Sequence, residues 1–279
     1  MKNLLPINDA EKKNVLEKKN IINKINAPNK QNREKTSAEP GGQETVFLNA
    51  ALLEILQKGG VDHWGFACLE ADREAIEEEY GSVWQDYPRA ISFAVNMPWA
   101  VVEQLLVAPT HTYLYYYDVV NDHINDITLN ICRYLESEGY RAFPIPASQR
   151  VENRLSGIFS HRWAAVLAGL GWIGKSCNLI NPQVGPRLRL GTVLTDAPLE
   201  TDLPLANGCG ECTICLDGCP AKAIKGVPFQ KGQGLEHRLD VLACDQHLLN
   251  MRHAFGKRIC GLCIALCPYG RKREQRKKT

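Results

Sequence analysis

The chain has 279 residues, which is enough for one large domain with a buried core and one small domain. Eleven cysteines without an opening apolar leader favour a reducing cytoplasm over a secreted disulfide framework, and no apolar stretch is long enough to cross a membrane. The net charge of +2 conceals two basic ends, +5 over 1–37 and +8 over 252–279, which leaves −11 for 38–251. We expect solvated tails; contact with RNA phosphates or with an acidic electron-transfer partner is the alternative.

The first part of the chain is predicted to be a charged, disordered extension over residues 1–43, with a short helix around 10–24. A folded body then extends over 44–205. Its first expected elements are a helix over 47–55 that stops at Gly59-Gly60, and strands over 61–69 and 90–95.

The second half of the body is predicted to open with a long helix from about 115 to 139, where apolar residues recur at helical spacing. An extended segment over 141–146 and a helix over 160–168 follow. The runs 177–180 and 188–194 are separated by turn residues and are predicted to pair as a hairpin. A small domain over 206–270 and a basic tail over 271–279 complete the chain.

Eight cysteines gather in that small domain. The first four, with Pro220, have the C-x2-C-x2-C-x3-C-P spacing of bacterial two-cluster ferredoxins, in which the fourth cysteine binds the neighbouring cluster. A second run supplies three thiols before Pro268, and Cys244 is the available fourth. The crossing rule assigns Cys209, Cys212, Cys215 and Cys267 to cluster 1, and Cys219, Cys244, Cys260 and Cys263 to cluster 2. Zinc is the competing metal, but it leaves both Cys-Pro endings unexplained.

Gly169, Gly171 and Gly174 match the G-x-G-x-x-G pattern of dinucleotide-binding turns. Such a turn follows a strand and opens a helix, whereas these glycines follow a predicted helix and precede strand-like residues. We therefore expect a tight helix-to-strand turn. The alternative is a backbone surface that a large flat ligand approaches closely, with Trp172 beside it and Lys175 available to an anionic group.

Several other residues are open to two interpretations. His161 is either a proton donor or metal ligand, or a satisfied core residue. The tyrosines at 113, 115, 116 and 117 either line a pocket or pack in the core. Cys68, Cys132 and Cys177 lie outside the cluster pattern and are predicted to be small buried apolar residues.

Two blocks of sequence resemble the superfamily of epoxyqueuosine reductases and reductive dehalogenases. One runs from Ala168 to Lys175 and continues through Leu179-Ile-Asn-Pro182 and Leu194-Thr-Asp196; the other is the cysteine region with its detached Cys244. The resemblance implies an α+β chain, in which a nitroreductase-like α/β body that binds cobalamin precedes a ferredoxin-like domain with two 4Fe–4S clusters. The residues implied to contact cobalamin are Gly169, Gly171, Trp172, Ile173, Gly174 and Lys175.

The sequence also departs from the family pattern. Members carry a catalytic aspartate in an Asp-Ser-Ala-Pro segment before the glycine block, where this chain reads Ile145-Pro-Ala-Ser-Gln-Arg-Val-Glu152. Glu152 and His161 are therefore the candidate proton donors, together with the tyrosines.

The resemblance implies an oxidoreductase that passes electrons from a ferredoxin or flavodoxin through two clusters to cobalamin, with epoxyqueuosine in tRNA as the family's substrate. One alternative is an electron-transfer protein that reduces a partner corrinoid or flavin protein. Another is a reductase that itself binds flavin.

Overall fold

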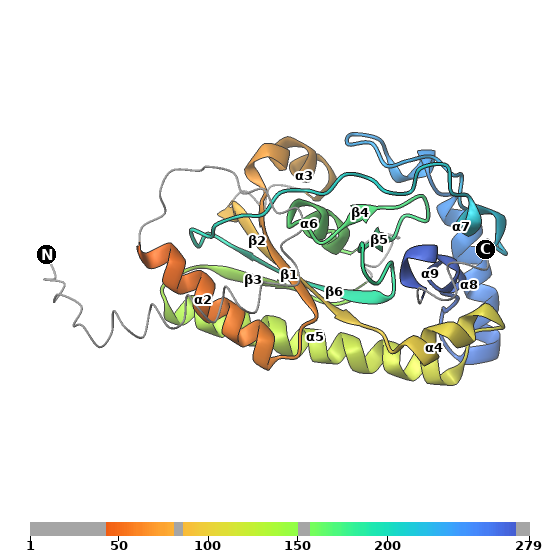
Figure 1. Cartoon of the computed structure of the whole chain (residues 1–279), viewed down its shortest axis with the longest axis horizontal. Coiled ribbons are helices and arrows are strands. Elements are labelled where there is room, and N and C mark those ends of the chain that lie inside the picture. The colour runs from red at the N-terminus through yellow and green to blue at the C-terminus, as the bar shows by residue number, and fades with distance from the viewer. Residues whose placement is uncertain (1–42, 81–85, 150–156, 272–279) are drawn as a thin grey trace, which may run out of the picture.

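The computed structural model describes residues 43–80, 86–149 and 157–271. Its centre is a four-stranded antiparallel sheet in the order β1-β2-β6-β3 (Figure 1). The strands are β1 (His63–Cys68), β2 (Arg89–Asn96), β3 (Ala142–Ile145) and β6 (Leu188–Thr195). The architecture is therefore a mixed helix and sheet fold, as expected from the sequence.

The two faces of the sheet carry side chains of different size, because successive residues of a strand point to opposite faces. On one face Phe66, Ile91 and Phe93 join the larger apolar core. On the other face Ala90 and Ala94 pack with the alanines of a helix. Small side chains on this second face let that helix approach the sheet closely.

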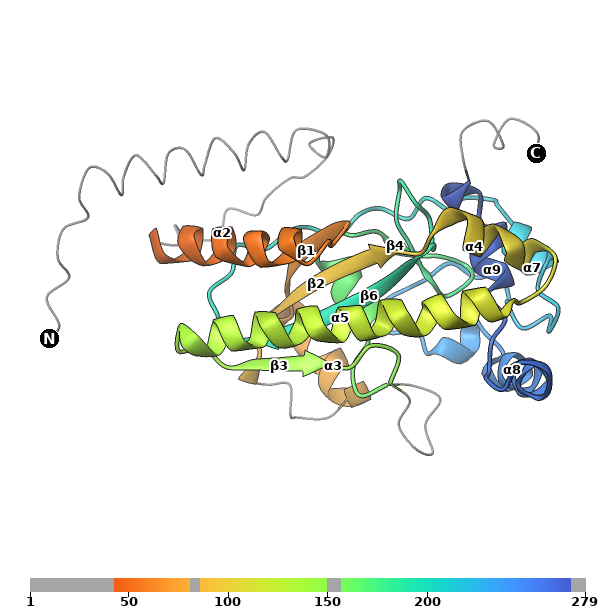
Figure 2. The same cartoon turned by 90° about the horizontal axis from the view of Figure 1, so that it is seen from below.

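Helices cover both faces. α2 (Gln43–Lys58) and α5 (His111–Ser137) lie side by side, and α5 runs along β3 and β6 (Figure 2). α6 (His161–Leu167) packs on the opposite face against β1, β2 and β6. Thr110 caps α5 and Ser160 caps α6, because each side chain accepts a hydrogen bond from the backbone N–H three residues later.

The predicted hairpin between 177–180 and 188–194 is wrong. β5 (Leu179–Ile180) pairs with β4 (Trp172–Ile173), whereas β6 pairs with β2 and β3 in the main sheet. The residues between them form only an isolated bridge, Asn181 with Gly185. The glycine block is the tight helix-to-strand turn that its context predicted, since it joins α6 to β4.

The cysteine-rich segment lies at one end of the sheet, beside α4 (Trp99–Glu103) and the start of α5 (Figures 1 and 2). Its helices are short except α8 (Val241–Phe255). Asp240 caps the N-terminus of α8, and Gly256, in the left-handed conformation, caps its C-terminus. The remaining elements are η2 (Glu70–Asp72), α3 (Arg73–Tyr80), η4 (Gln104–Leu106), α7 (Ile214–Asp217), η5 (Leu235–His237), α9 (Leu262–Leu266) and η6 (Pro268–Gly270).

Some sequence predictions fall outside the described residues. These are the helix around 10–24, Glu152, and the extension 1–43 and tail 271–279 apart from Gln43 and Arg271. Within the described ranges, no helix combines the length and the apolar character that crossing a bilayer requires.

Candidate functional site

The cysteines of the small domain influence one another's pKa values, so their thiols lie near one another; two sets of four are here called the first and second groups. Burial, together with the nearby charges of Cys209, Cys215 and Cys212, raises the pKa of Cys267 to about 11. These four thiols form the first group, with Cys215 on α7. Cys267, which follows α9, is 52 to 58 residues from the other three in sequence, so only the tertiary fold unites them.

The second group consists of Cys219, Cys244, Cys260 and Cys263. Burial raises the pKa of Cys244, and the charges of Cys219 and Cys260 add to this effect. Burial also raises the pKa of Cys263 to about 12, with smaller contributions from Cys260, Cys215 and Cys244. Because Cys215 of the first group lies near Cys263 of the second, the two groups are neighbours.

The glycine turn packs against the first group. Trp172 Nε1 donates to Cys209 Sγ over 3.4 Å, and Lys175 Nζ donates to the carbonyl oxygen of Cys212 over 3.2 Å. A Cβ on Gly174 would lie 3.3 Å from Cys209 Sγ. The turn thus supports the cysteine loop at close range, a role that its spacing alone did not indicate.

A cleft of about 460 Å³, here called the central cleft, adjoins the second group. This volume lies within the range of small-molecule sites. Asn178 lines the cleft and its Nδ2 donates to Cys263 Sγ over 3.4 Å, while Ile264, next to Cys263, lines it too. The remaining walls come from α3, α5, β5, β6 and the segments 145–149 and 157–162. Of the six residues that the resemblance assigns to cobalamin, none lines the central cleft.

Arg189 and Tyr117 form a polar wall of the central cleft. The Arg189 guanidinium lies 3.9 Å from the centre of the Tyr117 ring, and Arg189 Nε donates to Asn121 Oδ1 over 3.0 Å. Arg189 also donates to Ser148 Oγ, and the Tyr117 hydroxyl donates to the same oxygen over 3.2 Å. This network fixes the Tyr117 hydroxyl at the edge of the cleft.

The tyrosines of α5 separate into distinct environments. Tyr113 is buried, whereas Tyr115 is 66% exposed and Tyr116 is 39% exposed. Tyr117 is the member of the four that lines the central cleft. The core interpretation is therefore correct for Tyr113 and the pocket interpretation for Tyr117, whereas the exposed Tyr115 and Tyr116 fit neither.

His161 lines the central cleft with both ring nitrogens engaged. Its Nε2 lies 3.2 Å from the Pro146 carbonyl oxygen and must donate, so Nδ1 accepts from the Thr192 hydroxyl at 2.9 Å. Burial lowers the pKa of His161 to about 4, and the positive charges of Arg189 and Arg162 act in the same direction. These contacts favour the satisfied core residue over a proton donor.

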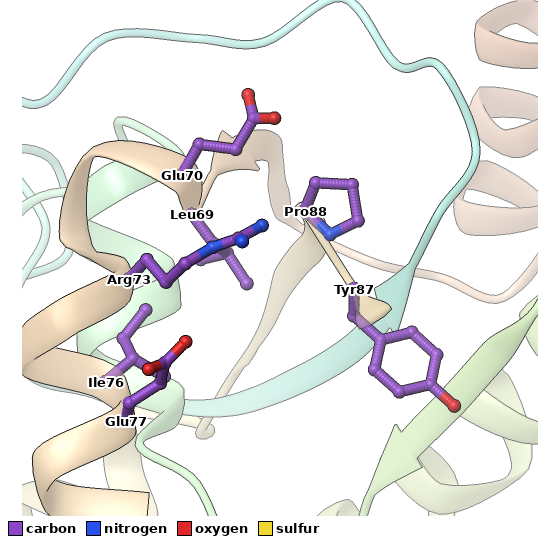
Figure 3. Close-up of a pocket in the computed structure, with 7 residues that line it drawn as sticks. All are labelled: Leu69, Glu70, Arg73, Ile76, Glu77, Tyr87 and Pro88. Carbon is purple, nitrogen blue, oxygen red and sulfur yellow. The ribbon is translucent and has the colours of Figure 1, made fainter. Parts of the chain in front are cut away.

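A smaller hollow lies between η2, α3 and the start of β2 (Figure 3). It holds about 10 Å³, room for about one water molecule, and the Arg73 side chain extends across it. It is therefore no candidate for a substrate or cofactor. Among the described ranges, no three His, Cys, Asp or Glu side chains are placed to hold a single metal ion.

No family model matches the chain. Epoxyqueuosine reductase of Staphylococcus aureus is 36% identical over 121 residues, which are 42% of this chain and 31% of the relative. The Vibrio cholerae protein of the same name is 30% identical over 194 residues, 66% of this chain and 50% of the relative. The chain thus spans about a third to a half of the length of these curated relatives.

Two kinds of solved structure share the fold. A catabolic reductive dehalogenase superposes with a TM-score of 0.62 at 18% identity, over 88% of this chain and 35% of that chain. Epoxyqueuosine reductase from Bacillus subtilis superposes with a TM-score of 0.53 at 22% identity, over 82% and 67%. These two structures show that the chain has the fold that both enzymes share. Together with the sequence matches, they support the resemblance of the chain to the superfamily of epoxyqueuosine reductases and reductive dehalogenases.

Proposed function

We propose that the chain is an iron–sulfur oxidoreductase in which two 4Fe–4S clusters relay electrons to a cobalamin that reduces a substrate in the central cleft. In this proposal residues 44–205 are the nitroreductase-like, cobalamin-binding body. Residues 206–270 are the ferredoxin-like domain. The observation that carries the proposal is the arrangement of eight thiols in two groups of four, one of which adjoins the cleft.

The donor set fits two clusters. Thiolates are the ligands of 4Fe–4S clusters, and each group contains the four that one cluster needs. The crossing rule assigns Cys267 to the first cysteine run and Cys219 to Cys244 and Cys260, and the effects of these thiols on one another's pKa values support this assignment. Both groups lie in a partly buried setting, which also influences the potential of a cluster.

The central cleft fits a cofactor that must lie close to the second group. Tyr117, Ser148 and Arg189 would face the bound cofactor from one side, and Asn178 and Ile264 would separate it from Cys263. Cobalamin bound there would supply a strongly reducing cobalt centre. The glycine turn contributes indirectly in this proposal, because it holds the loop of Cys209 and Cys212 in place.

Tyr117 is the proton donor that the geometry supports best. Its hydroxyl lies in the cleft, and its contacts with Ser148 and Arg189 hold it in one orientation. His161 is less suited to this role, because burial and the charges of Arg189 and Arg162 lower its pKa to about 4 and keep it neutral at neutral pH. Reduction of an epoxide needs a proton for the oxygen that is released, so a fixed hydroxyl at the cleft meets a chemical requirement.

The substrate we propose to test first is epoxyqueuosine in tRNA, on the precedent of the curated relatives. One solved epoxyqueuosine reductase, with a TM-score of 0.53 and 23% identity, is described in complex with an epoxyqueuosine-modified tRNA stem loop. A low-potential ferredoxin or flavodoxin is the proposed electron donor.

The test is anaerobic reconstitution of the full chain with iron and sulfide, followed by iron analysis, cobalamin titration and an assay on the modified stem loop. About eight irons per chain, stoichiometric cobalamin and loss of the epoxide would support the proposal. A zinc-loaded, colourless protein would contradict it at the first step.

The second candidate function is an electron-transfer protein that reduces a partner corrinoid or flavin protein. The observation that favours it is the missing aspartate in 145–152, because a carrier needs no proton donor. Reconstituted protein with about eight irons that binds no cobalamin, yet reduces a separate corrinoid protein, would support this function.

A further inference from the structure

A second cleft, here called the side cleft, lies between α3, α6 and the segment 229–238. Its volume is about 490 Å³, and the lining residues that it shares with the central cleft are Glu79, Tyr80, Ser160, Arg162 and Leu235. Lys231 fastens the segment to the body through an ion pair with the buried Asp72, which also accepts a hydrogen bond from Trp163 Nε1 over 2.7 Å. Contacts between residues far apart in the sequence therefore hold the walls of the side cleft together.

Arg238 lines the side cleft in an unusual state for an arginine. The residue is only 6% exposed, and its Nε is buried without a hydrogen-bond partner. Its guanidinium rests 4.8 Å from the centre of the Phe229 ring, and NH1 makes a 3.9 Å contact with Cys177 Sγ. Within the described residues no carboxylate pairs with it, and a buried, uncompensated charge is costly.

Arg162 supplies a second positive charge at the same place. Its NH1 donates to the Cys177 carbonyl oxygen, so both guanidinium groups reach the same buried residue. Within the described ranges Arg162, too, has no carboxylate partner. Two convergent guanidinium groups match the charge and the geometry of a phosphate better than those of a carboxylate, because a phosphate monoester carries nearly two negative charges at neutral pH.

The rest of the lining specifies the body of the ligand. Tyr80, Trp163 and Phe229 provide aromatic surface, and the buried Oε1 of Gln233 lacks a donor among the described residues. The exposed rim is acidic, with Glu78, Glu79 and Glu236. This rim disfavours a polyanion, so the chemistry points to a small molecule with one phosphate, a flat ring and an N–H group.

We propose that the side cleft is a second binding site, for a phosphate monoester of an aromatic ring compound, with the phosphate on Arg238 and Arg162 and the ring N–H on Gln233. The site requires neither clusters nor cobalamin. Its failure is therefore distinguishable from failure of the proposed redox function.

The experiment uses the full, reconstituted chain without cobalamin and two matched pairs of probes. Adenosine monophosphate is compared with adenosine, and flavin mononucleotide with riboflavin, by calorimetric titration. In at least one pair we expect the phosphorylated compound to bind about tenfold to a hundredfold tighter, the range for hydrogen bonds to charged groups. Equal affinity within both pairs, or no binding of any probe, would overturn the proposal.

Arg238→Met tests the arginine, and Arg252→Met, an exposed site on α8, is the control with the same charge change. We expect Arg238→Met to raise the melting temperature of the unliganded protein by a few degrees, because it removes an uncompensated buried charge. It should also abolish the preference for the phosphorylated probe, whereas Arg252→Met should change neither property. A lower melting temperature with loss of iron–sulfur absorbance would show that Arg238 balances cluster charge, and would overturn the proposal.

Gln233→Leu provides a second variant on a partly exposed segment. We expect it to weaken both members of the pair that binds by about the same factor, so that the preference for phosphate persists. A loss of that preference alone would contradict the assigned orientation of the ligand.

Discussion

The side-chain amide of Asn178 donates to Cys263 Sγ over 3.4 Å while the same residue lines the central cleft. One residue thus contacts both the second thiol group and the space where a substrate or cofactor would lie. Ile264 also lines the central cleft, and it directly follows Cys263 on α9. These two side chains therefore provide a direct link between the proposed relay and the proposed reaction.

Replacing Asn178 by Leu should lower the reduction potential of cluster 2, because a hydrogen bond to a cluster sulfur stabilises the more negative reduced state. One hydrogen bond of about 0.5–1.5 kcal/mol corresponds to about 20–60 mV for a one-electron couple. The measurement is an EPR-monitored redox titration. Asn250→Leu, at an exposed position on α8, is the control and should leave both potentials unchanged.

Replacing Cys267 by Ala should remove one cluster and leave the other. We expect iron to fall from about eight to about four per chain, because cluster 1 loses a ligand that lies with Cys209, Cys212 and Cys215. Cys132→Ala is the control, since that buried cysteine of α5 belongs to neither group. Unchanged iron in Cys267→Ala would contradict the assignment of the thiols.

Replacing Tyr117 by Phe should lower turnover about 10²- to 10⁴-fold, the usual contribution of a general acid, without a comparable loss of cobalamin affinity. The assay is reduction of an epoxyqueuosine stem loop with a chemical reductant, and binding is followed separately by visible spectroscopy. Tyr115→Phe changes a 66% exposed hydroxyl of the same helix and should retain full turnover. Equal rates in the two variants would rule out Tyr117 as the proton donor.

His161 should make the protein less stable as the solution is acidified. Its pKa is lowered to about 4 in the folded chain by burial and by Arg189 and Arg162, whereas an unfolded histidine titrates near 6.5. Between these values the unfolded chain binds the extra proton, so stability falls with pH from about 6.5 to about 4 and is unaffected by this group above 6.5. Over that window we expect a loss of about 3 kcal/mol.

Thermal denaturation of wild type and His161→Gln at a series of pH values measures this effect. The variant should show a flatter pH dependence between 4 and 6.5, even if its stability at neutral pH is lower. Parallel curves for the two proteins would indicate that His161 does not have a lowered pKa. His247→Gln, on α8, is a control at a histidine far from His161 in the sequence.

Replacing Gly171 by Ala should disrupt the turn that supports the cysteine loop. A Cβ at this position would collide with the carbonyl oxygen of Ile180, which is backbone and cannot move aside. We expect a loss of more than about 3 kcal/mol and poor retention of iron. Gly210→Ala is the matched comparison: its Cβ has open space but its φ is +47°, so only backbone strain of about 1–2 kcal/mol applies. Equal losses for the two variants would refute the steric explanation.

The sequence predicted the elements that depend on near neighbours. The long helix was expected at about 115–139 and extends over His111–Ser137, and the strand expected at 90–95 extends over Arg89–Asn96. Both follow from side-chain periodicity, which is a local property. The hairpin was wrong because strand pairing depends on the whole sheet: Leu188–Thr195 lies between β2 and β3, and the two-residue β5 pairs with the glycine turn.

The candidate site was only partly predictable. Spacing predicts eight cysteine ligands, and their assignment to clusters stays a prediction. Nothing in the sequence pattern selects Asn178, because its sulfur partner is 85 residues away. Arg189 can be recognised in the sequence, because it is a charged residue within the apolar run 188–194. A charge retained inside a strand often serves a site.

Both thiol groups draw on the segment that contains Cys260, Cys263 and Cys267, more than forty residues after the first cysteine run. Cluster 2 could therefore receive its full set of ligands only after the ribosome has translated Cys263, and cluster 1 only after Cys267. Before Cys260 is translated, the nascent chain would carry five of the eight thiols without their partners, exposed to oxidation. In the proposed function, iron–sulfur loading would accordingly follow, rather than accompany, synthesis of the body.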